Sequence, residues 1–149
     1  DPENIGFTGC SAGGHLTLMV ATSSLTPAYE PIDDVDKLPC HVNWAVPVYP
    51  AYALADGLEQ GNTKKGNDLS DALAPEFKFD AKTPPMFLVH GDKDYYSPMG
   101  SVLLYTELHK RKIPAQLFVY ANVSHGLGDT ANAQGWQQRI VDWIESIGF

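Results

Sequence analysis

The stretch NIGFTGCSAGGHLTLMVATSS, residues 4–24, decides the fold. It begins with a short apolar run over residues 4–9, passes through Gly9-Cys10-Ser11-Ala12-Gly13, and continues as an apolar segment of helical length over residues 13–24. A strand followed by a small-residue turn and a helix is typical of an α/β unit with a parallel sheet. Because the segment over 13–24 is apolar on nearly all sides, we expect it to form a buried helix.

Three more apolar runs have the length of strands: HVNWAVPVY at 41–49, PMFLVH at 85–90 and AQLFVY at 115–120. Their nearly continuous apolar character predicts strands that helices cover on both faces. Since helical patterns alternate with these runs, the sequence predicts a three-layer α/β fold with a mostly parallel sheet and crossover helices. A length of 149 residues fits a single domain over residues 1–149.

Two further helices are predicted after the third and fourth strands. The first has Ser97 as its N-cap and Pro98 in its first turn, and the second begins at about Gln134. Each carries apolar residues at helical spacing, which we expect to cover a face of the sheet. These are Met99, Val102, Leu103 and Leu108 in the first helix, and Trp136, Ile140, Trp143, Ile144 and Ile147 in the second.

The segment over residues 51–84 has a different character, with Gly, Asn, Lys and Asp scattered among short apolar groups. A connection of this length inside a compact domain is usually functional. We therefore expect an inserted loop over 51–84 that shapes a pocket.

Composition excludes several classes of partner. The formal net charge is −8, and the ten Lys and Arg residues cluster only at Lys110-Arg111-Lys112, so we expect neither nucleic acid nor a membrane as partner. No metal-binding motif is present, and we expect no cofactor. Cys10 and Cys40 are too few for a disulfide framework, and a strand's length separates them, so we expect two unpaired, buried residues.

The sequence Gly9-Cys10-Ser11-Ala12-Gly13 fits the nucleophile elbow G-x-S-x-G, because it follows a strand and precedes a helix. Such a turn is tight, which predicts that the residues two before and two after Ser11 must be small. The helix that follows directs free N–H groups and its positive end at the reacting centre. We expect the Ala12 N–H to stabilise an oxyanion there.

A nucleophilic serine needs a histidine as base and a carboxylate that orients the histidine. Asp92 and Asp94 follow the third strand, and His125 follows the fourth, so all reach the sheet edge on which Ser11 lies. The order serine, acid, histidine matches a known arrangement on such sheets. The residues alone leave the acid open between Asp92 and Asp94.

The remaining candidates have weaker signals. We interpret His15, His41, His90 and His109 as structural residues. Tyr95, Tyr96 and Trp136 follow the acid and the histidine and could stack on a substrate, although aromatic residues at such places more often pack in the core. Cys10, beside the serine, is a further candidate for contact with substrate.

Four segments carry a family resemblance: GFTGCSAGGHL, TPPMFLVHGDKD, SHGLG and WQQRIVDWIESIGF. With them, the chain resembles the esterase and lipase branch of the α/β hydrolases, and most closely bacterial acetyl esterases that act on acetylated xylan and xylo-oligosaccharides. The resemblance implies a serine esterase for small acetyl esters or acetylated carbohydrate. It implies Ser11 as nucleophile, His125 as base, and Asp94, the last residue of H-G-x-x-D, as acid.

One departure from that family bears on activity. Its members have a further half upstream with the first strands and an H-G-G type loop, which donates a second oxyanion N–H. We therefore expect a partial domain whose strand over residues 4–9 is an exposed edge, to be covered by a second chain or copy. Two alternatives stay open: a serine peptidase of the prolyl oligopeptidase type, or an inactive fragment that acts as a folding or binding unit. The compartment is left open.

Overall fold

The computed structural model describes residues 3–55, 71–128 and 131–149. Its strands are β1 (Gly6–Cys10), β2 (Trp44–Val48), β3 (Met86–Gly91) and β4 (Ala115–Tyr120). Its helices are α1 (Ala12–Thr22), α2 (Met99–Lys110) and α3 (Trp136–Ser146), with a short 3₁₀ turn over Ala131–Ala133. The strands form one sheet in the order β1-β2-β3-β4, and every neighbouring pair is parallel. The four predicted strands are confirmed within a few residues.

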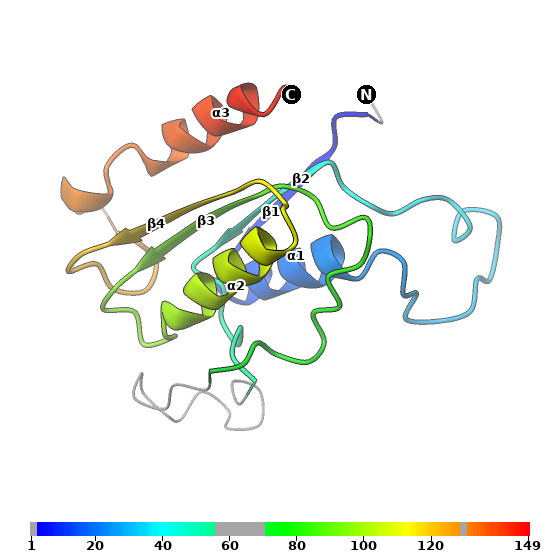
Figure 1. The fold of residues 1–149 in the computed structure, drawn as a ribbon, viewed down its shortest axis with the longest axis horizontal. Coiled ribbons are helices and arrows are strands. Elements are labelled where there is room, and N and C mark those ends of the chain that lie inside the picture. Colours follow the sequence, from blue (N-terminus) through cyan, green and yellow to red (C-terminus); the bar gives the residue numbers. More distant parts are fainter. Residues whose placement is uncertain (1–2, 56–70, 129–130) are drawn as a thin grey trace.

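The sheet separates two layers of helices. Helices α1 and α2 lie on one face and α3 lies on the other (Figure 1). Alternate residues of the central strands therefore contribute to two separate cores, with Met86 and Leu88 facing α1 and α2, and Phe87 and Val89 facing α3. This arrangement confirms the predicted three-layer fold.

Burial differs sharply between the strands. All six residues of β3 are buried, whereas β1 lies at the edge of the sheet. At this edge Phe7 is 40% exposed, and the preceding Ile5 is 48% exposed. The exposed edge expected for this strand is therefore present in the described structure.

Helix α1 differs from the prediction, because only one of its faces is buried. Thr17, Leu18 and Ala21 lie within the buried set, but Leu16 is 60% exposed. The helix covers the sheet with one side only, so an apolar composition alone overestimated its burial. The predicted burial of Cys10 is also wrong, because Cys10 lies on β1, the exposed edge strand of the sheet.

Cys40 is also exposed, in the irregular segment that precedes β2, and both cysteines are unpaired thiols. The prediction that they do not pair is confirmed, but the prediction that they are buried is wrong.

In the two later helices, the apolar residues predicted to cover the sheet can be compared with those that are buried. In α2 the buried residues are Gly100, Ser101, Leu104 and Leu108, while Met99 is 37% exposed. The buried face of α2 thus includes two small residues that the apolar pattern did not indicate. Gly100 is needed there because α2 packs closely on Ala53, and a Cβ on Gly100 would lie 2.7 Å from the Ala53 Cβ. In α3, by contrast, the predicted apolar residues do face the core cluster that contains Phe87.

The described parts of the connection from β2 to β3, residues 49–55 and 71–85, lie on the α1 and α2 side of the molecule (Figure 1). An isolated antiparallel bridge joins Leu54 and Leu73, and Phe77 and Phe79 are buried in the core beneath α1 and α2. Residues 56–70 of the predicted 51–84 loop lie outside the described residues. Within the described part of the chain, no helix is long and apolar enough to span a membrane.

Candidate active site

The candidate site lies where β1, β3 and β4 end. Because these strands are parallel, the residues that follow them meet at one edge of the sheet. Ser11 follows β1, Asp94 follows β3 and His125 follows β4. The structure brings these three side chains, far apart in the sequence, into contact.

Ser11 occupies the sharp turn between β1 and α1. Its backbone has φ 56° and ψ −119°, a conformation that non-glycine residues rarely adopt and that is held only by strong surrounding contacts. The Ser11 N–H donates to the Val48 carbonyl at 3.0 Å, and the Ser11 carbonyl accepts from the His15 and Ala51 N–H groups at 3.1 and 3.0 Å. These bonds hold the turn against the end of β2 and the first turn of α1.

Glycine is required at some of the predicted positions of this turn and not at others. A Cβ on Gly9 would collide with the Gly13 carbonyl, and one on Gly14 would lie 2.9 Å from the Pro50 Cα. A Cβ on Gly13 would meet nothing within 4 Å outside its own helix. The prediction that contacts demand a small residue two positions after Ser11 is therefore wrong, and the close approach falls on Gly14.

His125 connects the serine to a carboxylate. Its Nε2 lies 2.9 Å from the Ser11 Oγ, and its Nδ1 lies 2.9 Å from Asp94 Oδ1 and 2.8 Å from Oδ2. A carboxylate only accepts, so Nδ1 carries the hydrogen and Nε2 of the neutral ring accepts from the Ser11 hydroxyl. The ring is thus in the tautomer that can remove the serine proton.

Asp94 is buried and well supplied with donors. It accepts from the Tyr96 N–H at 2.8 Å, and the Nε2 of the buried His90 lies 3.4 Å from its Oδ2. Burial alone would raise the pKa of Asp94, but hydrogen bonds from His90, the Tyr96 N–H and His125 outweigh burial and lower that pKa. The carboxylate is therefore held in its charged form.

Asp92, the other candidate acid, has a different environment. Its side chain accepts from the Val123 N–H at 3.3 Å, and the residue is exposed. Around it, the acid loop and the histidine loop are joined by backbone bonds from the Asp92 N–H to the Tyr120 carbonyl and from the Lys93 N–H to the Val123 carbonyl, both 3.0 Å long. Asp92 thus ties the two loops together, while Asp94 contacts His125.

Three tyrosine rings surround the His125 ring. The ring centroids of Tyr49, Tyr95 and Tyr96 lie 5.0, 4.6 and 5.1 Å from its centroid. Sequence reasoning identified Tyr95 and Tyr96 but missed Tyr49, although its position directly after β2, at the same sheet edge, was a usable signal. The ring of His125 is therefore confined on several sides.

The hydroxyl groups of Tyr49 and Tyr96 are held protonated. Burial, followed by a contact with Cys10, raises the pKa of Tyr49 to about 12. Burial also raises the pKa of Tyr96, whose hydroxyl donates to the Tyr52 hydroxyl at 3.2 Å. Both groups remain hydrogen-bond donors at neutral pH.

Of the other predicted contact residues, Cys10 and Ala12 lie beside Ser11, whereas Trp136 does not. Cys10 is exposed beside Ser11, and Ala12 opens α1, so its N–H has no acceptor within the helix. Trp136 instead begins α3 and packs against the core cluster that includes Phe87 and Trp143.

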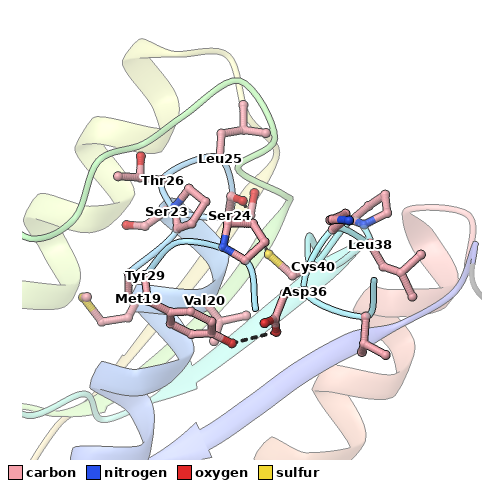
Figure 2. Close-up of a pocket in the computed structure, with 16 residues that line it drawn as sticks. Met19, Val20, Ser23, Ser24, Leu25, Thr26, Tyr29, Asp36, Leu38 and Cys40 are labelled. Atoms are coloured by element: carbon pink, nitrogen blue, oxygen red, sulfur yellow. Dashed lines mark hydrogen bonds between the residues drawn. The ribbon is translucent and has the colours of Figure 1, made fainter. Parts of the chain in front are cut away.

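A separate groove lies away from these side chains. It has a volume of about 640 Å³ and is formed by the C-terminal half of α1 and residues 23–40. Figure 2 shows its lining, with the Tyr29 hydroxyl donating to Asp36 at 2.8 Å. Ser11, Asp94 and His125 are not among its lining residues.

Among residues 3–55, 71–128 and 131–149, no group of three His, Cys, Asp or Glu side chains is placed to hold a metal ion.

Comparison with known families gives one match over nearly the whole chain. The model of the prolyl oligopeptidase family matches residues 1–147. Among curated relatives, the probable carboxylic ester hydrolase LipM of Mycobacterium tuberculosis is 29% identical over 139 residues, which cover 83% of this chain and 31% of LipM. Dipeptidyl-peptidase 5 of Aspergillus fumigatus is 32% identical over 75 residues, covering 50% of this chain and 10% of the peptidase.

Solved structures extend the likeness to the full chain. An acetyl ester-xyloside bifunctional hydrolase from Caldicellulosiruptor lactoaceticus has a TM-score of 0.79 and 31% identity, covering 100% of this chain and 58% of that one. A thermophilic esterase from Thermogutta terrifontis, in its propionate-bound form, has a TM-score of 0.71 and 25% identity, with coverage of 100% and 58%. This chain thus spans 31% of LipM and 58% of both solved structures.

Proposed function

Because the chain belongs to the prolyl oligopeptidase family of α/β hydrolases, we propose that it supplies the catalytic residues of a serine esterase for short-chain acyl esters. The observation that carries this proposal is the placement of His125 between Ser11 and Asp94, at 2.9 and 2.8 Å. This contact pattern is the one that an activated serine nucleophile requires.

The proposed reaction has two stages. His125 Nε2 removes the Ser11 proton as Oγ attacks the ester carbonyl, and Asp94 stabilises the imidazolium that forms. The imidazolium returns its proton to the leaving alcohol, which leaves an acyl group on Ser11. His125 then activates water, which releases the acid and restores the serine.

The oxyanion formed in each stage needs donors. We assign one donor to the Ala12 N–H, at the start of α1, because a helix N-terminus directs both a free N–H and a positive dipole at the reacting centre. A single oxyanion donor is typically worth about 100-fold to 1000-fold in rate. The activity of this chain will therefore depend on whether a second donor is supplied.

The proposed substrate class is a small acetyl ester, and acetylated carbohydrate in particular. The likeness to a hydrolase named for acetyl ester and xyloside supports this class. So does Tyr95, which is 47% exposed beside His125 and offers an aromatic face to a sugar ring. We place Tyr96 and Cys10 near the bound ester, and we assign pocket shaping to the 51–84 segment, whose Tyr52 contacts Tyr96.

Trp136 is the weakest of the predicted contacts, since it packs against the core on the α3 side of the sheet. We assign it a substrate contact only where a bound ligand extends toward the start of α3.

A peptidase is the second candidate function, and it has its own supporting observation. The matching family is named for prolyl oligopeptidase, and dipeptidyl-peptidases 5 are among the relatives. The same serine, histidine and aspartate would cleave an amide by the same steps. Faster hydrolysis of a proline-containing chromogenic peptide than of an aryl acetate would favour this candidate.

The test compares aryl acetate hydrolysis by the purified chain, its Ser11→Ala variant and a Ser24→Ala control. Ser24 lies in the segment after α1 and lines the separate groove. We expect Ser11→Ala to abolish turnover and Ser24→Ala to retain it. Equal rates for the native chain and Ser11→Ala would contradict the proposal, and a native chain without any activity would favour a fragment that acts as a folding or binding unit.

A further inference from the structure

His90 is a buried titratable residue that takes no part in the contacts between Ser11 and His125. It is the fifth residue of β3, and none of its surface is exposed. Both ring nitrogens have partners: Nδ1 lies 2.8 Å from the Ser101 Oγ, and Nε2 lies 3.0 Å from the Tyr96 carbonyl oxygen. A buried histidine with both nitrogens engaged has a fixed ring orientation.

These partners also determine the tautomer of His90. A carbonyl oxygen only accepts hydrogen bonds, so Nε2 must carry the hydrogen. In the neutral ring Nδ1 is then an acceptor, and the Ser101 hydroxyl donates to it. Ser101 is itself completely buried on α2, so water does not compete for this bond.

The Nε2–H group of His90 faces a second acceptor, the candidate acid. It lies 3.4 Å from Asp94 Oδ2, while Asp94 Oδ1 accepts from the Tyr96 N–H at 2.8 Å. His90 therefore contacts both the carboxylate of Asp94 and, two residues further along the same loop, the carbonyl group of Tyr96. Rotation of the carboxylate would break these contacts inside a region that offers no water in exchange.

We propose that His90, held by Ser101 in its Nε2–H tautomer, is a positioning residue that fixes the Asp94 carboxylate in the orientation needed by His125. One carboxylate thereby contacts two imidazole rings, of which His125 also contacts Ser11. The kinetic consequence rests on the proposed esterase function, whereas the arrangement of the two rings does not.

The tautomer can be measured in the unmodified protein. In ¹⁵N-histidine-labelled chain at neutral pH, long-range proton–nitrogen correlations distinguish the two ring nitrogens of each histidine. We expect the hydrogen of His90 on Nε2, as its partners require, and the signals absent from a His90→Gln spectrum identify it. A hydrogen on Nδ1 of His90 would overturn the proposal, since the ring would then accept at Nε2 or carry a charge.

Two substitutions separate positioning from filling of space. Glutamine can place an amide N–H near the Nε2 position, whereas asparagine reaches only the Nδ1 position. We expect the low-field proton resonance of His125 Nδ1–H to persist in His90→Gln and to shift or vanish in His90→Asn. The kcat for an aryl acetate should fall by about 10-fold to 100-fold in His90→Asn, since small misplacements in an active site can cost about 100-fold. It should stay nearer the native value in His90→Gln, with KM unchanged in both.

An unchanged His125 resonance in a folded His90→Asn variant would overturn the proposal, and if that variant does not fold, the tautomer in the native chain decides. A native chain that shows the expected tautomer and resonance but hydrolyses no ester would contradict the esterase proposal alone.

Discussion

Replacing Asp94 by Asn tests the contact between the acid and the histidine. Asp94 presents two acceptor oxygens to three donors: the His125 Nδ1–H at 2.8 Å, the Tyr96 N–H at 2.8 Å and the His90 Nε2, which is 3.4 Å away. Asparagine has only one acceptor oxygen, so its NH₂ group must face a donor unless His125 changes tautomer. In the changed tautomer, Nε2 carries the hydrogen and can no longer accept the Ser11 proton.

The expected loss of kcat in Asp94→Asn follows from that change of tautomer. A wrongly protonated histidine base costs about 10⁴-fold in kcat in a comparable serine enzyme, which corresponds to about 5 kcal/mol of transition-state stabilisation. The assay is the steady-state rate on an aryl acetate, with Asp92→Asn as the matched control. Asp92 is exposed, and its Oδ1 accepts from the Val123 N–H at 3.3 Å. Asparagine keeps an acceptor oxygen at that position and so preserves this bond between the loops, and we expect a change of about twofold or less. The reverse pattern, a large loss in Asp92→Asn and a small one in Asp94→Asn, would refute the reasoning.

Three further predictions concern stability. Gly9→Ala should lower the free energy of unfolding by about 1–3 kcal/mol, because the new Cβ would collide with the Gly13 carbonyl. Gly13→Ala should not destabilise the chain, since its Cβ meets no such neighbour. Urea unfolding of both variants measures the two losses, and equal losses would contradict the prediction. Trp143→Ala should cost about 3–5 kcal/mol because the side chain is buried against the sheet, with exposed Gln138→Ala as the control in thermal unfolding. Tyr49 has its pKa raised by burial from 10.0 to about 12, so its contribution to stability is complete below pH 10 and is lost as the pH rises toward 12. Tyr49→Phe should reduce that alkaline loss in unfolding measurements at pH 9 and 11.5, and an unchanged pH dependence would contradict the assignment.

The sheet and the order of its residues were predictable from short-range patterns. The apolar runs at 41–49 and 85–90 are long and continuous enough to define buried strands, and glycine or proline marks several of their ends. Once the strands are parallel, residues that follow them must meet at one edge. Ser11 and His125 could therefore be placed together without any knowledge of the side-chain positions.

The choice between Asp92 and Asp94 was beyond the residue pattern, and only the family resemblance favoured Asp94. The decision depends on where a tight turn directs two carboxylates that are two residues apart. In the structure the Asp94 N–H bonds to the Gly91 carbonyl at 3.3 Å, and a Cβ on Gly91 would collide with the Val123 carbonyl. This close packing of the acid loop on the histidine loop is a tertiary effect that periodicity does not contain.

Burial was also mispredicted where it was inferred from residue type alone, without the position of the residue in the fold. The stripe of α2 was assigned from its apolar residues, yet Gly100 and Ser101 are buried because Ala53 and His90 lie close to them. Small and polar residues carry no periodic apolar signal, so close approach and a buried hydrogen bond were both missed. Cys10 was assigned to the interior for its residue type, but its strand is an edge.

The central claim is that His125 activates Ser11 as a nucleophile, and covalent labelling tests it most directly. The purified chain would be incubated with an aryl phosphonate that reacts with activated serines, and the modified residue located by peptide mass spectrometry. The account predicts one adduct per chain, on Ser11, with none in Ser11→Ala and a much slower reaction in His125→Ala. Labelling of another residue, or equal labelling rates in the native chain and His125→Ala, would contradict the claim.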